Sequence, residues 1–258
     1  MQVNKVMKIL SFRLQGKMAH FRRYYSNSSA LSYTVPPRTT VAGMVAGLLG
    51  YPRDSYYGIF SLDHCRVALM NGSPVKKQMQ KMNLLMIKSP NDLNGSQDFH
   101  SQTPTELVIP QDIRKGFLDY RIWFYHKDPG IMDELEHLLK TARPGYCSRG
   151  VSLALGTAMH LGWMIFDGAT AGKEVVPAGP VPVLSVIPMP KLERIEFGES
   201  PVSYRLIREE LPLEFDGDRL ATERGKADML ISLTGSPVTA RVSSAVMLDD
   251  GTYITWME

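Results

Sequence analysis

The order in which strand-like and helix-like patterns follow one another most constrains how this chain can fold. Residues 3–14 alternate apolar and polar side chains, which is typical of a strand. Residues 36–49 begin with two prolines and end at Gly50, which predicts a helix. Four further segments follow: strands at 61–71 and 117–126, a helix from 128 to about 142, and a strand at 158–166. This series predicts an α+β domain of the ferredoxin-like (RRM-like) βαββαβ type, which RNA-recognition domains share.

The domain organisation follows from where this series ends. We expect a ferredoxin-like RNA-binding domain over residues 1–170 and a smaller, mostly β C-terminal region over 171–258. The proline- and glycine-rich stretch 177–190 is the expected linker between them. Short strand patterns then follow at 202–207, 238–247 and 252–256.

The polar stretch 89–105 has no periodicity of either kind. It lies between a basic, methionine-rich segment and a short strand pattern at 106–110. It therefore predicts the tip of a long β-hairpin or a mobile loop.

Several classes of protein are excluded by composition. No uncharged apolar run reaches the ~20 residues needed to span a bilayer, so we expect no membrane; with only two distant cysteines, a reducing cytoplasm is the expected compartment. Cys65 and Cys147 lie far apart and have no second ligand pair nearby, which disfavours a disulfide scaffold and a zinc site. Neither a P-loop nor a dinucleotide fingerprint is present, and no carboxylates have metal-binding spacing. We therefore expect neither a cofactor nor a metal.

The charge of the chain is strongly polarised along its length. Residues 1–60 carry a net charge of +7, residues 61–127 of +3, and residues 128–258 of −7. Such a chain is expected to present one face to a polyanion. The alternative is that solvated faces simply differ in charge.

A basic and aromatic segment over residues 17–25, which we call the basic loop, indicates which kind of polyanion the protein binds. It contains Lys17, His20, Phe21, Arg22, Arg23, Tyr24 and Tyr25. Cations neutralise phosphates and aromatic faces stack on unpaired bases, so both are needed in a site for single-stranded RNA. We predict that Arg22 and Arg23 hold phosphates and that Phe21 or Tyr24 stacks on a base. The alternative is an exposed strand end with tyrosines in the core.

The start of the predicted helix is a second candidate site. Arg38, Thr39 and Thr40 lie where unpaired backbone N–H groups favour an anion, although Thr39 or Thr40 can equally be helix caps. We expect Arg38 to support the RNA-binding turn. Gly43 and Gly47 lie four residues apart, and each interior glycine costs about 1 kcal/mol relative to alanine. Close packing of the helix on its sheet is the expected compensation.

Together these motifs resemble the N-terminal signature of CRISPR-associated protein family five. The resemblance is carried by Gly16-Lys17, His20-Phe-Arg22, Thr34-Val-Pro-Pro-Arg-Thr-Thr40 and the glycines from Gly43 to Gly50. Leu153-Ala-Leu-Gly156 resembles a second, weaker landmark of that family. The sharp similarity covers about a fifth of the chain.

The resemblance implies a non-catalytic subunit of a type I CRISPR interference (Cascade) complex. Such a subunit binds and caps the 5′ handle of the crRNA, and it scaffolds assembly with a backbone subunit and a large subunit in antiviral defence. It meets target DNA only through the complex. A projecting β-hairpin thumb is implied at about 76–105, with Lys76, Lys77 and Lys81 near its stem. Tyr24-Tyr25 and the segment 252–256 favour a I-B-like subtype.

Two other functions stay open. One is a metal-independent endoribonuclease of the same fold that processes precursor crRNA. It would need a base, an acid and a cation, for which His20, Tyr24, Lys17 and His126 are the candidates. The other is a general single-strand binder outside CRISPR defence. A lone histidine in a basic protein is more often a structural hydrogen-bonding group or an RNA contact, so we expect no enzyme.

Overall fold

The α+β class and the order of the first six main elements are as predicted. The computed structural model describes residues 6–26, 29–83, 90–94, 96, 102–141, 153–197 and 204–258. Its central elements are β1 (Met7–Gly16), α1 (Arg38–Leu48), β4 (Cys65–Asn71), β7 (Leu118–His126), α3 (Pro129–Thr141) and β8 (Gly162–Val175). The four strands lie in the order β8-β1-β7-β4, and each is antiparallel to its neighbour.

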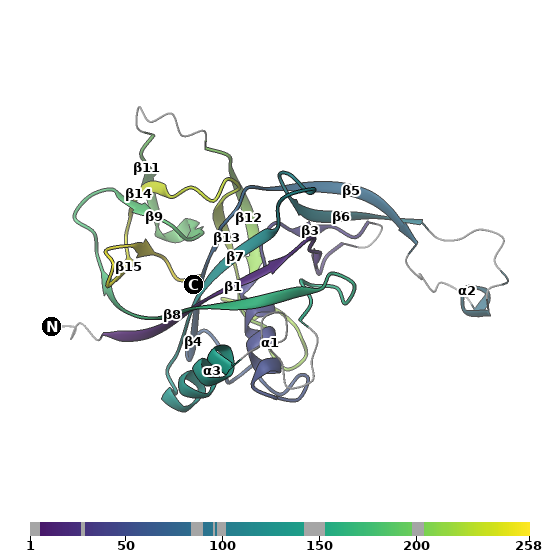
Figure 1. Cartoon of the computed structure of the whole chain (residues 1–258), viewed down its shortest axis with the longest axis horizontal. Coiled ribbons are helices and arrows are strands. Elements are labelled where there is room, and N and C mark those ends of the chain that lie inside the picture. The colour runs from purple at the N-terminus through teal and green to yellow at the C-terminus, as the bar shows by residue number, and fades with distance from the viewer. Residues whose placement is uncertain are drawn as a thin grey trace.

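Both long helices cover the same face of this sheet, as Figure 1 shows. The period-2 pattern of β1 explains why, because Leu10, Phe12 and Leu14 all point into the core beneath the helices. Ile9 points to the other face and packs with Trp256 from the C-terminal end. β1 is therefore buried on both faces over much of its length.

The predicted thumb is present as a long antiparallel hairpin. β5 (Val75–Asn83) pairs with β6 (Gln102–Pro110) over their whole length. Figure 1 shows this hairpin projecting from the body of the protein, with α2 (Pro90–Asn94) beyond its end. The expected tip thus contains a helical segment, while residues 84–89, 95 and 97–101 lie outside the described residues.

The C-terminal strands continue the central sheet. They are β9 (Val181–Val183), β11 (Leu192–Ile195), β14 (Val238–Val242), β15 (Ala245–Leu248) and β16 (Tyr253–Ile254). They complete a nine-stranded sheet in the order β11-β14-β9-β16-β15-β8-β1-β7-β4. β10 (Ile187–Pro188), β12 (Leu206–Pro212) and β13 (Lys226–Ser232) form a separate three-stranded sheet, and a 3₁₀ turn spans Met189–Lys191.

The linker predicted at 177–190 is wrong, and the expected boundary at residue 170 falls inside β8. β8 runs without interruption from the N-terminal part of the sheet to β15. Val183 and Val186 are 0% and 3% exposed, so this stretch belongs to the core. Pro182 is the central residue of β9, and Pro188 is the last residue of β10. No helix in the described parts of the chain is long and apolar enough to cross a membrane.

Candidate nucleic-acid interface

The basic loop is held between the hairpin and a turn that follows α3. Within it, β2 (Phe21–Arg22) pairs with β3 (Ser32–Tyr33). The His20 backbone N–H donates to the Leu155 carbonyl at 3.0 Å. Gly156 has φ +95°, and a Cβ at this position would lie 1.9 Å from the His20 carbonyl oxygen, so only glycine fits. The two segments that carry the family resemblance therefore lie against each other.

Two predicted RNA contacts of the basic loop point into the protein. Phe21 is 2% exposed and meets Tyr120 edge-on, with the ring centroids 5.8 Å apart. His20 is 3% exposed, and its Nδ1 lies 2.7 Å from the Glu106 carbonyl oxygen. This burial leaves Tyr24 as the residue for the predicted stacking on a base, and it leaves little of the His20 side chain for the predicted RNA contact. Strand alternation in β2 buries Phe21 and exposes Arg22.

The exposed members of the basic loop are Arg22, Tyr24 and Tyr25. Tyr24 and Tyr25 are 52% and 49% exposed, and their rings meet edge-on at 5.2 Å. The other side of Tyr24 contacts the ring of Phe215. Within the described part of the chain, the Arg22 side chain makes only a long hydrogen bond, 3.4 Å, to the Ser26 carbonyl. An exposed cation and exposed aromatic rings are thus side by side, as a site for single-stranded RNA requires.

Two of the predicted RNA-binding cations are neutralised inside the protein. The carboxylate of Glu209, on β12, accepts hydrogen bonds from Arg23, from Lys77 Nζ at 3.1 Å and from the Thr34 N–H at 2.9 Å. Lys77 also pairs with Glu106 at 3.3 Å. Arg23 and Lys77 are therefore ion-paired within the protein, and their predicted contacts with RNA stay a prediction. Such ion pairs between the basic N-terminal part and the acidic C-terminal part of the chain neutralise some of the charge that is polarised along the sequence.

The remaining lysines differ in how available they are. Lys17 Nζ donates to the Gly116 carbonyl at 3.0 Å and lies 3.8 Å from the centre of the Phe117 ring. Lys76 is half-buried and Lys81 is exposed, both on β5. Neither has an ion-pair partner among the described residues. The hairpin thus offers two uncompensated cations.

Arg38 is not at the surface. It is 1% exposed, and its guanidinium donates to the carbonyls of Leu213 (2.7 Å), Phe60 (3.0 Å), Ser61 (2.9 Å) and Cys65 (2.5 Å). Burial lowers the pKa of this guanidinium. The predicted support of an RNA-binding turn by Arg38 is therefore replaced by a structural role. It ties the start of α1 to β4, the loop before it and the C-terminal region.

Two adjoining cavities lie at the start of α1. The α1 cavity, of about 540 Å³, is lined by α1, the loop 53–60 and the segment 213–219. The loop cavity, of about 250 Å³, is lined by Arg22, Tyr24, Tyr33 and neighbours. Thr39, Thr40, Gly156 and Phe215 line both. Thr39 and Thr40 do not cap the helix: the N-cap is Pro37, with no side-chain hydrogen bond.

The glycines of α1 face the α1 cavity. A Cβ on Gly47 would have no atom within 4 Å, and one on Gly43 would meet the Tyr56 hydroxyl at 2.8 Å. The expected close packing of Gly43 and Gly47 on the sheet is therefore wrong. Their absent side chains leave room in a cavity.

The residues proposed for an endoribonuclease are not all brought together. Lys17 follows the end of β1, where Gly16 pairs with Leu118, whereas His126 is at the other end of β7, about 26 Å away at ~3.3 Å per residue. His126 is 5% exposed, and its Nε2 lies 2.9 Å from the Ile59 carbonyl oxygen. His126 and Lys17 therefore cannot act on one phosphate.

A histidine missed in the sequence lies near His20. His160 is 8% exposed, and its Nδ1 lies 2.6 Å from the Thr157 hydroxyl. Burial, and secondarily the charge of His20, lowers the pKa of His160. Nothing in the local sequence around His160 signals this pairing, because the two histidines are far apart along the chain. Among the described residues, no three His, Cys, Asp or Glu side chains lie close enough together to hold a metal ion.

Part of the chain is similar to a known protein family. Residues 9–101 match a family model described as CRISPR-associated protein (Cas_Cas5). A crystal structure of a CRISPR protein from Archaeoglobus fulgidus aligns with a TM-score of 0.57 and 13% identity, covering 96% of this chain and 98% of that one, which shows a shared fold. A chain described as CRISPR RNA-guided surveillance complex aligns with a TM-score of 0.42 and 12% identity, over 90% and 91%. No curated protein matches the chain.

Proposed function

We propose that this chain, whose residues 9–101 match a family model described as CRISPR-associated protein (Cas_Cas5), is a Cas5-family subunit that binds and caps the 5′ handle of a crRNA. In this proposal it is a non-catalytic subunit of a type I, I-B-like interference (Cascade) complex. The carrying observation is that Arg22, Tyr24 and Tyr25 are exposed together beside the start of α1. Phosphate and bases of one single strand can be held there at the same time.

The start of α1 adds a second point of attachment for phosphate. Its N-cap is Pro37, which has no side-chain hydrogen bond, and its first turn contains no acid. An N-terminus of this kind carries roughly half a positive charge and favours an anion. Thr39 and Thr40 line the cavity where Arg22 and Tyr24 also lie. A strand held by the basic loop can therefore continue past α1.

The projecting hairpin supports the scaffolding part of the proposal. Lys76 and Lys81 are uncompensated among the described residues, and Met79 on the same strand is 50% exposed. A basic, partly apolar hairpin suits a contact with both RNA and a neighbouring backbone subunit. A large subunit is the further expected partner, and target DNA is met only through the assembled complex.

Charge reversal at Arg22 tests the proposal. Arg22→Glu should weaken binding of handle RNA at least about tenfold, because a hydrogen bond to a charged group contributes roughly 1.5–3 kcal/mol. Arg241→Glu is the matched control, since Arg241 is exposed on the distant strand β14. Fluorescence anisotropy with labelled handle RNA and a scrambled RNA of equal length measures both. Unchanged affinity for Arg22→Glu would contradict the proposal, and equal binding of the scrambled RNA would favour a general single-strand binder.

A metal-independent endoribonuclease is the second candidate, and it is favoured by the backbone of Leu155, which hydrogen-bonds both His20 (3.0 Å) and His160 (2.8 Å) and so brings the two histidines near each other. Two histidines can act as the base for a 2′-hydroxyl and the acid for the leaving 5′-oxygen. Incubating the pure protein with repeat RNA in a chelator decides the matter. Specific cleavage that is lost in His20→Ala or His160→Ala would replace the non-catalytic proposal.

A further inference from the structure

We infer that the α1 cavity is a pocket for one nucleotide that is turned out of the bound RNA strand. This inference rests on the proposed function, because the strand must first be held by the basic loop. The inference adds a second nucleotide-binding site, which adjoins the loop cavity at the start of α1. The loop 53–60 and the C-terminal segment 213–219 build this site together with α1.

The helix side of the cavity has the flat surface that a base needs. Gly43 and Gly47 leave backbone exposed along one side of α1, and the space beyond Gly47 is open for at least 4 Å. Glycine inside a helix is unfavourable, so its repeated use indicates that something approaches the backbone closely. A planar base can lie against such a surface, whereas larger side chains on α1 would occupy the same space.

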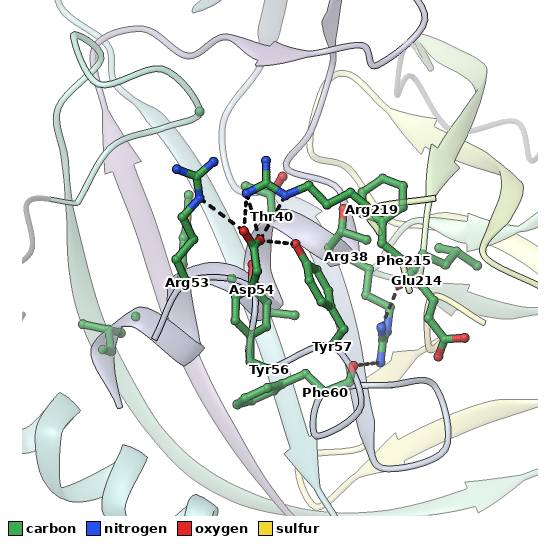
Figure 2. Close-up of a pocket in the computed structure, with 18 of the residues that line it drawn as sticks. Arg38, Thr40, Arg53, Asp54, Tyr56, Tyr57, Phe60, Glu214, Phe215 and Arg219 are labelled. Atoms are coloured by element: carbon green, nitrogen blue, oxygen red, sulfur yellow. Dashed lines mark hydrogen bonds and ion pairs between the residues drawn. The ribbon is translucent and has the colours of Figure 1, made fainter. Parts of the chain in front are cut away.

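The opposite side is aromatic. Tyr56 and Tyr57 lie with their ring centroids 4.9 Å apart and their planes inclined by 34°, and Phe60 and Phe215 complete the wall. Figure 2 shows Tyr56, Tyr57 and Phe215 around the same opening. Aromatic side chains stack on any base. The volume of about 540 Å³ lies within the roughly 300–1,000 Å³ range of small-molecule pockets.

The rim of the cavity is cationic and fixed in position. Arg219 donates to both carboxylate oxygens of Asp54, at 2.8 and 2.6 Å, and the Tyr57 hydroxyl donates to Asp54 at 2.6 Å (Figure 2). Arg53 lies 3.4 Å from the same carboxylate but its side chain is 81% exposed. Two arginines around one aspartate leave one positive charge for a phosphate group.

Backbone geometry sets this rim apart from the rest of the protein. Asp54 has φ +64° and Arg219 has φ +62°, and no other described non-glycine residue has a positive φ. Such conformations are costly for ordinary side chains and concentrate at functional sites. That both occur in one ion pair, from segments far apart in the chain, indicates that the rim is held in place for a ligand.

The two cavities form one path for a strand. They share Thr39 and Thr40 at the uncapped start of α1, so a phosphate there can link a base in the loop cavity to a base in the α1 cavity. Arg38 Nε, which belongs to a 1% exposed side chain lining the α1 cavity, has no hydrogen-bond partner in the described parts of the structure. Buried polar groups are normally hydrogen-bonded, so this donor lacks a partner that the described protein groups do not supply.

Filling the cavity tests the inference. Gly47→Leu places a side chain in the open space of the α1 cavity, and leucine also favours the helical conformation. Gly179→Leu is the matched control, because Gly179 also has open space around it but lies outside both cavities. The full chain is bound to handle RNA carrying thiouridine at successive positions and is photo-cross-linked. We expect one RNA position to cross-link to Tyr56 or Tyr57, which line the α1 cavity alone, in the wild-type protein. Gly47→Leu should abolish this cross-link and weaken binding about fivefold or more, as loss of one stacked base does.

Other outcomes overturn the inference and separate it from the proposed function. RNA that binds but cross-links only to the basic loop, or binds Gly47→Leu as tightly as wild type, removes the nucleotide pocket alone. The same holds if Gly47→Leu keeps its RNA affinity but loses a partner subunit, since the cavity would then take a protein side chain. Wild-type protein that binds no RNA overturns both statements. Tyr57→Leu, which removes one ring, repeats the measurement should Gly47→Leu not fold.

Discussion

Glu209 on β12 and Arg23 in the basic loop form an ion pair that joins the acidic C-terminal part of the chain to its basic N-terminal part. Glu209 is 6% exposed and also accepts hydrogen bonds from Lys77 and from the Thr34 N–H. One carboxylate thereby positions the basic loop, the base of the hairpin and the segment that leads into α1. The loop that presents Arg22 depends on a residue almost two hundred positions later in the chain.

Removal of Glu209 should therefore destabilise the protein strongly. Glu209→Ala leaves Arg23 and Lys77 partly buried without this acid, and breaking a buried pair costs about 3–5 kcal/mol. Glu210→Ala is the control, because Glu210 is 44% exposed and an exposed pair contributes about 0–1 kcal/mol. Urea unfolding followed by circular dichroism measures both. Equal midpoints for the two variants would show that Glu209 is not a structural anchor.

Arg38→Gln should destabilise the fold and should not act as a simple RNA-binding defect. A glutamine amide cannot reach the Leu213 carbonyl and the Phe60, Ser61 and Cys65 carbonyls together, and a lost hydrogen bond to a charged group costs about 1.5–3 kcal/mol. Thermal unfolding measures the loss of stability. The RNA affinity of the folded fraction shows whether the substitution also weakens RNA binding. A fully stable variant with weakened RNA binding would contradict this structural role and favour a direct contact of Arg38 with RNA.

Alanine at the two helix glycines should give different results. Gly47→Ala places a methyl group in open space, and the gain in helix propensity of about 1 kcal/mol should raise the melting temperature by roughly 2–4 °C. Gly43→Ala should gain less, because its Cβ meets the Tyr56 hydroxyl at 2.8 Å and that ring must shift. Differential scanning calorimetry of both variants provides the comparison. A larger gain at Gly43 would contradict the geometry of the α1 cavity.

His160 should make the protein less stable in mild acid. The pKa of His160 is lowered below its ordinary value of 6.5, chiefly by burial. The unfolded chain therefore binds a proton more readily than the folded one, so stability is lost as the pH falls through 6.5 towards the lowered pKa. Unfolding midpoints on both sides of pH 6.5 should differ more for wild type than for His160→Gln. Parallel pH profiles for the two proteins would refute this assignment.

Periodicity in the sequence was sufficient for the elements whose burial is regular. β1, β4, β7, α1 and α3 were all expected, because alternation and a helical stripe are local consequences of which side faces the core. β13 was missed, and the short strands β9 and β10 were taken for a linker. Their pairing partners lie far away in the chain, so no local pattern defines them.

The candidate site shows the same division between local and long-range information. Residue types in the basic loop were enough to suggest RNA, since cations and aromatic rings occur there at high density. Which of them are exposed was decided by contacts with β3, β6 and β12: these contacts bury His20 and Phe21 and neutralise Arg23, and they leave Arg22, Tyr24 and Tyr25 outside. The α1 cavity was not foreseen, because Phe215 and Arg219 reach it from the other end of the chain.

By itself, the sequence determined the α+β class, the order of the central elements and the chemical character of one surface. These properties depend on side-chain type and spacing within a few turns or strand residues. The tertiary structure alone decided which charged side chains form ion pairs within the protein and which aromatic rings remain at the surface. It also decided that Gly43 and Gly47 face a cavity instead of the sheet. The physical reason is that burial and charge pairing depend on neighbours brought together by folding, and here those neighbours come from opposite ends of the chain.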